Sequence, residues 1–405
     1  MTTDALLVCI AGGVRAAAVS LVGVIIAIHL AAGGLSPVGI GLVIGIGIAS
    51  SAVGTILVGL WGDKWGRRYT LLVLGLLTAL GYVSIASTHR IGALLIVAVV
   101  GMVNGMGRDR GPASALDQAI LPAVVSDNQR TWALAWYNVA VDSGHALGAL
   151  AAVTPTMLER FAAISQSAAH ALTFDLSAGV VMLATVPYAF LSNSAEAPSA
   201  TSPTLRRTVA DARTGRTVRK LALLFGLDSV GGGFLNSALI AFWFFHRYGM
   251  SEVQLAVLFF AARVLNVVSH LAAAWMARRI GLLNTMVVTH LPSSVLLMLA
   301  PAAPTAALAA ALFLAREALV EMDVPTRQSY VMAVVPPAAR TFASGMTNVT
   351  RNAGWAVGPL LGGSVMQHVA LAGPLFIGGA LKIVYDLMLY RSFRHIRPPE
   401  EGGSL

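Results

Sequence analysis

Charge is scarce in this sequence. Only 11% of its 405 residues are Asp, Glu, Lys or Arg, whereas soluble domains carry roughly 25%. Apolar residues make up 57% of the chain, and the mean hydropathy is +0.76. Long stretches lack charge and short connectors hold it, which is the pattern of membrane spans joined by loops. The composition excludes an ordinary soluble domain and predicts a protein of the lipid bilayer.

Cysteine is nearly absent as well. Cys9 is the single one, so an internal disulfide is excluded, and no Cys or His spacing is typical of a metal site. The metallopeptidase, nucleophile-elbow and phosphate-loop motifs are missing too. We therefore expect no metal, no cofactor and no enzyme activity. A basic leader region is also lacking before the first apolar run, so we interpret that run as a retained helix.

Apolar runs of about 20 residues are what the sequence has in abundance. They predict an all-α membrane protein with twelve transmembrane helices. The predicted spans are 5–32, 38–60, 69–88, 92–122, 129–153, 169–192, 219–246, 252–277, 284–303, 305–335, 340–367 and 371–391.

Basic residues are distributed unequally between the two sets of loops. Three lie in the loops that follow odd-numbered spans: Arg90, Arg160 and Arg247. Sixteen lie in the other set, which includes the tail: Lys64, Arg67, Arg68, Arg130, Arg206, Arg207, Arg213, Arg216, Arg219, Lys220, Arg278, Arg279, Arg340, Arg391, Arg394 and Arg397. This bias predicts that both termini are cytoplasmic. The net charge of +9 is then an orientation signal, so we expect no nucleic-acid partner.

One long polar stretch divides the spans six and six. The predicted domains are an N-terminal six-helix bundle at 1–192, a cytoplasmic linker at 193–218, a C-terminal six-helix bundle at 219–392 and a cytoplasmic tail at 393–405.

The two halves are an internal repeat. With a constant shift of 210, residues 117–148 align with 327–358 without a gap, and the aligned pairs include Gln118 with Gln328, Arg130 with Arg340, Gly144 with Gly354 and Gly148 with Gly358. Internal duplication is typical of transporters, whose solute site lies between the repeats near the bilayer midplane. We therefore expect a small-molecule solute as partner, in a protein that works as a monomer.

The connector between the second and third spans holds the sequence Gly59-Leu-Trp-Gly62-Asp63-Lys-Trp-Gly66-Arg67-Arg68. Gly66 permits a tight turn, and Asp63 lies among cations at a helix end. The sequence resembles the signature loop of the Major Facilitator Superfamily, G-x-x-x-D-[RK]-x-G-R-[RK]. The resemblance covers essentially the whole chain and implies that fold, with a bracing and gating role for Gly62, Asp63, Gly66, Arg67 and Arg68.

A second signature of that family's drug:proton antiporters is G-x-x-x-G-P-x-x-G-G on the fifth span. Here its full form lies on the eleventh span, from Gly354 through Gly358 and Pro359 to Gly363. Small residues at this spacing allow close helix packing, and proline can kink a helix. Because the motif stands in the other half, it weakens an interpretation as an exporter.

Ionisable residues inside spans are costly, about 2.5–3.5 kcal/mol each at the bilayer centre, so they face an aqueous cavity or pair with one another. The resemblance implies that the first, fourth, seventh and tenth spans line the cavity, and most of the buried charge falls there. We predict a solute or cavity role for Arg15, Arg108, Arg110, Asp228, Arg263, Glu317 and Arg351.

Proton coupling needs a carboxylate that can be neutral in one state and ionised in another. The candidates are Asp109, Asp142, Asp228, Glu317 and Glu321. We assign structural or gating roles to Asp117, Asp323, Arg327, Gly354, Gly358 and Pro359. Asp323 and Arg327 are one helical turn apart and can pair. Asp117 and Arg327 are repeat equivalents of opposite sign, and a latch between them is a hypothesis.

Two single residues leave alternatives open. Arg15 has no acid nearby on its own helix, so it could hold an organic anion or phosphate. The alternative is an ion pair across helices with Asp142 or Asp228. Tyr137 stands with Trp132 and Trp136 at the start of the fifth span, where an aromatic belt at the membrane interface is the simpler interpretation.

Two transport functions remain open from the sequence. One is a secondary active transporter that exports a small organic molecule in exchange for protons, an efflux antiporter of the bacterial inner membrane. The other is proton-coupled uptake or facilitated transport of a small organic anion. The intact loop favours the first, and the number of buried arginines favours the second.

Overall fold

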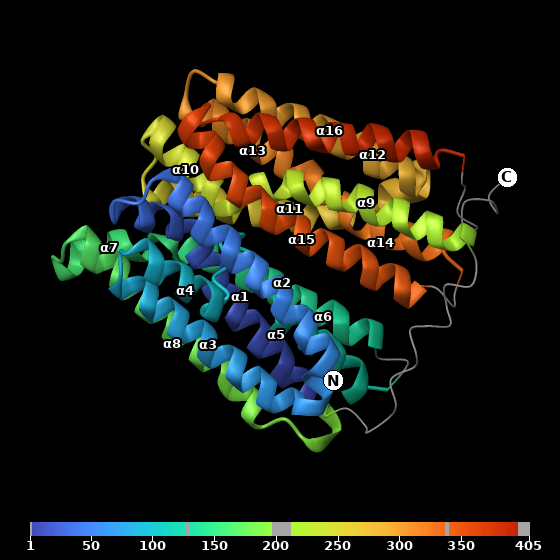
Figure 1. Cartoon of the computed structure of the whole chain (residues 1–405), viewed down its shortest axis with the longest axis horizontal. Coiled ribbons are helices and arrows are strands. Elements are labelled where there is room, and N and C mark those ends of the chain that lie inside the picture. The colour runs from blue at the N-terminus through green and yellow to red at the C-terminus, as the bar shows by residue number, and fades with distance from the viewer. Residues whose placement is uncertain (1, 127–129, 197–211, 337–339, 396–405) are drawn as a thin grey trace. The chain divides into compact units, whose positions relative to one another are not determined.

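The computed structural model describes residues 2–126, 130–196, 212–336 and 340–395. Helix is the only regular secondary structure among these residues, and most helices are long (Figure 1). The chain forms two compact units, each assembled from three segments of sequence. The predicted all-α membrane fold is confirmed. The middle of the predicted linker, residues 197–211, and most of the predicted tail lie outside the described residues.

The first unit comprises Met1–Ala200, Asn236–Phe260 and Pro359–Val369. Its complete helices are α1 (Thr3–Ala32), α2 (Pro37–Trp65), α3 (Arg67–Ser87), α4 (Ile91–Gly101), α5 (Pro112–Val124), α6 (Arg130–Leu150), α7 (Thr154–Ala162), α8 (Gln166–Ala189) and α10 (Ser237–Tyr248), with short 3₁₀ turns η2 (Ala151–Val153) and η3 (Asn193–Ala195). Helix α1 is the centre of this unit, because it packs against α6, α8 and α10.

The second unit comprises Thr201–Leu235, Ala261–Gly358 and Ala370–Leu405. Its complete helices are α9 (Ala212–Phe234), α12 (Leu282–Leu299), α13 (Ala306–Val320), α14 (Asp323–Val334) and α16 (Gly373–Phe393), with the 3₁₀ turn η5 (Ala300–Ala302). Helix α16 packs against both α9 and α12. Two further helices, α11 (Glu252–Ile280) and α15 (Arg340–His368), pass from one unit to the other along their length.

All the helices of the described residues fall on the twelve predicted spans, except α7, which lies between the fifth and the sixth. Eight helical stretches, one of which runs through α9 and α10, are long and apolar enough to cross a bilayer by length and composition. The fourth span is interrupted, because α4 ends at Gly101 and α5 starts at Pro112. The seventh is interrupted between α9 and α10, and the tenth between α13 and α14. Such discontinuous helices occur at membrane depth where the irregular backbone is buried in protein or lines a cavity.

The repeat glycines pack the same pair of helices in both units. A Cβ atom on Gly354 of α15 would lie 2.6 Å from the carbonyl oxygen of Gly226 on α9. In the first unit, Gly144 of α6 meets the backbone of Gly13 on α1 in the same way. Glycine at these positions lets two backbones touch, which only a missing side chain permits. The internal repeat predicted from the sequence is thus visible as a repeated helix contact.

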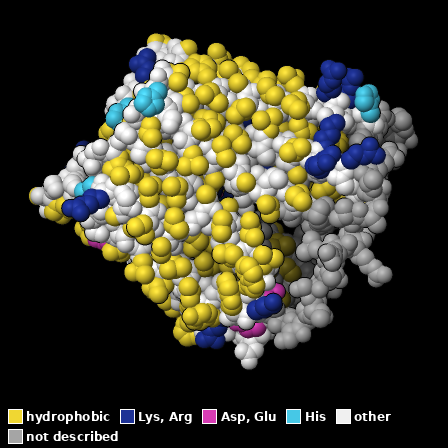
Figure 2. All heavy atoms as spheres, in the orientation of Figure 1, with side chains coloured by type: hydrophobic (Ala, Val, Ile, Leu, Met, Phe, Trp, Pro, Cys, Tyr) yellow, Lys and Arg dark blue, Asp and Glu magenta, His cyan; other side chains and the backbone are white. Residues whose placement is uncertain are grey.

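Hydrophobic side chains cover most of the face that Figure 2 shows, and Lys and Arg gather at its margins. Large apolar residues that are more than half exposed include Leu60, Ile96, Leu183 and Leu223. A soluble protein rarely exposes so broad an apolar surface. Lipid is the solvent that such a surface matches.

Candidate functional site

The first unit buries an arginine between two carboxylates. Arg15 of α1 donates from Nε to Asp109 at 2.7 Å and from Nη2 to Asp117 of α5 at 2.6 Å. Its Nη1 bonds to the hydroxyl of Tyr188 on α8. Tyr188 and Tyr137 in turn donate to Asp117 at 2.8 and 3.0 Å. Asp117 is fully buried and Arg15 is 7% exposed, so this cluster is a closed network of donors and acceptors.

Local backbone irregularity places Asp109 in that network. The ten residues between α4 and α5 form no helix, and Met102 takes a left-handed conformation at the end of α4. Asn104 organises the segment by donating to the carbonyl oxygen of Arg108 at 2.6 Å and accepting from the amide of Met106 at 2.8 Å. The amide of Asp109 then donates to Nε2 of His145 on α6 at 2.8 Å. A regular helix would have turned Asp109 elsewhere.

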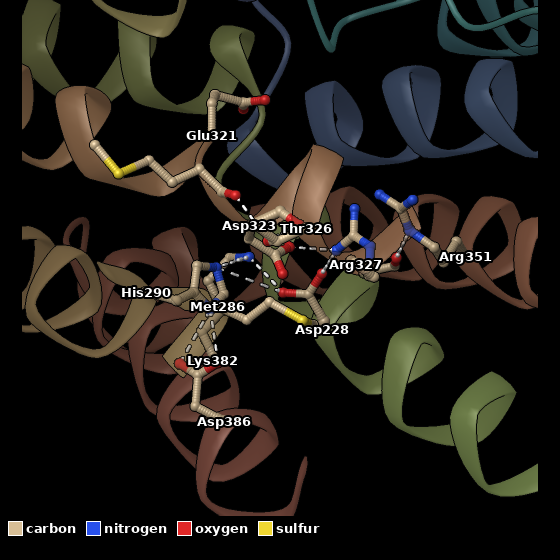
Figure 3. Close-up of polar contacts among 12 residues, drawn as sticks. Asp228, Met286, His290, Glu321, Asp323, Thr326, Arg327, Arg351, Lys382 and Asp386 are labelled. Atoms are coloured by element: carbon tan, nitrogen blue, oxygen red, sulfur yellow. Dashed lines mark hydrogen bonds and ion pairs between the residues drawn. The ribbon is translucent and has the colours of Figure 1, made fainter. Parts of the chain in front are cut away.

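The second unit contains a larger buried network (Figure 3). Asp228 of α9 accepts from Lys382 of α16 at 2.6 Å and from Arg327 of α14 at 3.3 Å. Arg327 also bonds to Asp323, one turn earlier on α14. All four side chains are buried. The pairing of Asp323 with Arg327 expected from their spacing is confirmed.

Two more titratable groups extend this network. His290 of α12 lies with Nδ1 2.9 and 3.0 Å from the two carboxylate oxygens of Asp386 on α16. Its other ring nitrogen, Nε2, is 3.4 Å from the ammonium nitrogen of Lys382 and 3.9 Å from Asp228. Figure 3 shows Lys382 reaching from beside His290 to Asp228. Five helix-borne charges and one imidazole therefore share one buried site.

The two networks are counterparts with opposite signs. In the first unit the arginine is on the opening helix and the acid, Asp117, is on the fourth span; in the second unit the acid is on the opening helix and Arg327 is on the tenth. Asp117 and Arg327 each have strong partners inside their own unit. Both residues therefore have a role in ion pairs within their own units, which is an alternative to the hypothetical latch between them.

Arg15 forms an ion pair across helices, which is the second of the two alternatives from the sequence. Its partners are Asp109 and Asp117, whereas the sequence-based alternative named Asp142 or Asp228. Asp142 lies instead 3.7 Å from Nδ1 of His145. The aromatic-belt interpretation of Tyr137 is wrong, because this side chain is 2% exposed and its hydroxyl bonds to Asp117.

The remaining predicted residues are distributed around these networks. Glu317 of α13 bonds to Arg316 beside it and accepts from Asn266 of α11 at 2.8 Å. Glu321, in the break before α14, is 3.9 Å from His270. Arg351 of α15 donates to Ser229 at 3.4 Å, next to Asp228 in sequence. Half-buried positions are taken by Arg108, Arg110 and Arg263.

The predicted signature loop is held by Glu196, a residue that was not among those predicted from the sequence. Arg67 donates to Asp63 at 2.7 Å and reaches the carbonyl oxygen of Ala119 on α5 at 3.3 Å. Glu196, just after η3, accepts from the backbone amides of Arg67 and Arg68 at 2.7 and 3.1 Å. Those amides are the unpaired donors at the start of α3, so Glu196 caps that helix. Gly66, with φ of 87°, makes the turn.

Comparison with known proteins supports the fold and the motif. Residues 8–359 match the model of the Major Facilitator Superfamily. The chain belongs to that family. An uncharacterized membrane protein of Saccharomyces cerevisiae is 24% identical over 380 residues, covering 86% of this chain and 85% of the yeast protein.

Solved structures of Major Facilitator Superfamily transporters share the fold. The nucleoside transporter NupG superposes with a TM-score of 0.74 at 14% identity, over 97% of this chain and 100% of that one. The D-xylose-proton symporter gives 0.71 at 14% identity, over 100% and 99%. The human organic anion transporter MFSD10 gives 0.59 at 17% identity, over 96% and 99%. This superfamily member is therefore a multi-pass membrane transporter and not an enzyme.

Proposed function

We propose that this transporter couples proton movement to the export of a small neutral or cationic organic molecule by alternating access. The observation that carries the proposal is the buried network around Asp228. It joins three carboxylates, two cations and a histidine, and it sits on helices next to the breaks in the seventh and tenth spans. Titratable groups in such places are typical of proton-driven transport.

The ion pairs of the buried arginines indicate which charge the solute carries. Arg15, Arg316 and Arg327 each bond to a carboxylate of their own unit. An arginine held in this way has its positive charge balanced, so it attracts a free anion weakly. These three ion pairs weaken the case for the anion carrier that was expected from the number of buried arginines. A neutral or cationic solute fits these balanced charges better.

Export is the direction that we propose for a solute with a largely apolar surface. The spans are rich in Ala and other apolar residues, which suit an apolar molecule. An apolar molecule crosses a bilayer inward without help, so only its outward movement needs an energy source. That the D-xylose-proton symporter shares the fold supports proton coupling and makes uptake the competing outcome.

The proposed setting is a plasma membrane with both termini in the cytoplasm and the protein acting as a monomer. The orientation rests on the bias of basic residues between alternate loops. The relative from yeast means that this setting is proposed without restricting it to bacteria.

The test uses purified protein in proteoliposomes with an imposed pH gradient of either sign. Tetraphenylphosphonium, uridine and benzoate serve as cationic, neutral and anionic probes. We expect gradient-driven accumulation of the cation or the nucleoside in the direction opposite to proton flow. Accumulation in the direction of proton flow would replace export by uptake, and a response to benzoate alone would restore the anion carrier.

A matched pair of variants shows whether the network is responsible. Asp228→Asn should abolish the gradient response, whereas Asp175→Asn, at an exposed position on α8, should keep it. If no probe responds to either gradient in the unmodified protein, the proposal of proton coupling fails.

A further inference from the structure

His290 has an unusual position, with a carboxylate on one ring nitrogen and an ammonium on the other. Asp386 faces Nδ1 at 2.9 and 3.0 Å, and Lys382 faces Nε2 at 3.4 Å. His290 is 1% exposed and Asp386 is fully buried. A neutral imidazole has one N–H donor and one acceptor nitrogen. Both contacts are satisfied together only if the hydrogen is on Nδ1, so that Nε2 can accept from Lys382.

Adding a proton to Nε2 would break this arrangement. The new N–H would point at an ammonium, which has no acceptor. Nε2 also lies 3.9 Å from Oδ1 of Asp228, the same oxygen to which Lys382 donates at 2.6 Å. Lys382 and a protonated His290 therefore compete for one oxygen atom.

The formal charge of the cluster leaves room for one proton. Asp228, Asp323 and Asp386 are acids, and Arg327 and Lys382 are bases. With a neutral His290 the sum is −1, and with a protonated His290 it is zero. Since a low-dielectric site disfavours net charge, the cluster can accept a proton without becoming cationic.

The other elements around His290 add no competing base among the contacts that the structure describes. On α16, Tyr385 stacks edge-on against the imidazole with ring centroids 5.9 Å apart. On α14, Asp323 is bonded to Arg327, which also donates to Asp228. Helix α13 also packs on α12, but its Glu317 is bonded to Arg316 and Asn266.

We propose that His290 is a proton switch: its protonation displaces Lys382 from Asp228 and so releases α9 from α16. The inference deepens the proposed function, on which it rests for the use made of the proton. Asp228 is the residue of α9 that would lose its contact with Lys382. It lies one turn before Gly232. A Cβ atom on Gly232 would be 3.9 Å from the ammonium nitrogen of Lys382, so alanine there would narrow the space into which Lys382 can move.

The first test is the tautomer of His290, read by ¹⁵N NMR on protein with labelled histidine in nanodiscs. His290→Gln assigns the signal among the nine histidines. If that variant does not fold, Tyr385→Leu assigns it instead through the lost ring contact. We expect the Nδ1–H tautomer at alkaline pH and a doubly protonated ring on acidification. The Nε2–H tautomer, or a ring that never titrates, would overturn the proposal.

The second test is hydrogen exchange along α9 at acidic and alkaline pH, read by mass spectrometry. After correction for the intrinsic slowing of amide exchange in acid, we expect α9 to be less protected at acidic pH than at alkaline pH in the unmodified protein. In Lys382→Gln the pH response of α9 should disappear although His290 still titrates. His246→Gln, at an exposed position on α10, is the matched control and should change neither readout. A pH response of α9 that survives in Lys382→Gln would show that Lys382 does not transmit the proton.

Both tests use protons as the only ligand, so they are independent of the solute. Failure of every probe to respond to a pH gradient would remove the proposed function and leave the tautomer and exchange results standing. Gradient-driven transport that persists in His290→Gln would keep the proposed function and remove the switch.

Discussion

At the scale of single residues, the two networks differ in what surrounds the central acid. Asp117 accepts from Arg15 and two tyrosine hydroxyls, none of which changes charge near neutral pH. Asp228 accepts from Lys382 and Arg327, with His290 close by. The first network has the composition of a permanent clamp, and the second that of a switch.

The clamp should weaken when its tyrosine is removed. Tyr188→Phe deletes the hydroxyl that contacts both Arg15 and Asp117. Leaving buried polar groups short of a partner costs about 1–3 kcal/mol, so we expect that loss in the free energy of unfolding, measured by denaturant titration in detergent. Tyr69→Phe is the matched control, because Tyr69 is 66% exposed. Equal stability of the two variants would contradict the clamp.

At the scale of elements, the sequence predicts which segments are helices better than where helices break. Hydropathy locates all twelve spans, and the charge at 108–110 and Pro325 mark the interruptions of the fourth and tenth. The break between α9 and α10 has a weaker signal, namely Asn236, which caps α10 by accepting from Leu239 at 3.0 Å. The hydropathy of an apolar run reflects the free energy of transferring the whole segment into lipid. A two-residue interruption of the helix changes that sum very little.

The candidate site is predicted in part for the same reason. Asp228, Asp323 and Arg327 stand out as charges in apolar runs, and the structure joins them. Lys382 and Asp386 satisfy the same criterion on the last span and are missing from the predicted set. Their spacing of four residues was the available signal. The partners Tyr188 and Glu196 depend on contacts between segments more than 70 residues apart, which a single sequence without an alignment does not contain.

Helix packing in the second unit should depend on one repeat glycine. In Gly354→Ala the new Cβ would lie 2.6 Å from the carbonyl oxygen of Gly226 and 2.9 Å from Cβ of Ser229. Because α15 and α9 must separate to make room, we expect a loss of about 1–3 kcal/mol in the free energy of unfolding. Gly179→Ala on α8 has no atom within 4 Å and serves as the control. If both substitutions have the same effect, the close approach of α15 and α9 is not required.

At the scale of the whole molecule, the loops should face opposite compartments in alternation. Arg90→Cys, just before α4, and Lys64→Cys, in the last turn of α2, place thiols at exposed positions in a background where Cys9 is replaced by Ser. The bias of basic residues predicts that an impermeant maleimide labels position 90 in intact cells. Position 64 should react only after permeabilisation. The opposite result would invert the proposed orientation.

Each compact unit draws residues from both sides of the central polar stretch. Asn236–Phe260 and Pro359–Val369 belong to the first unit although they follow that stretch in the sequence. A gene cut after the sixth span would therefore encode two polypeptides, and the first would lack α10, which packs on α1. Expressed alone, the amino-terminal fragment should be degraded, and co-expression of the missing fragment should rescue it. We therefore expect the polar stretch to be a boundary of the sequence repeat that does not separate two independently stable parts.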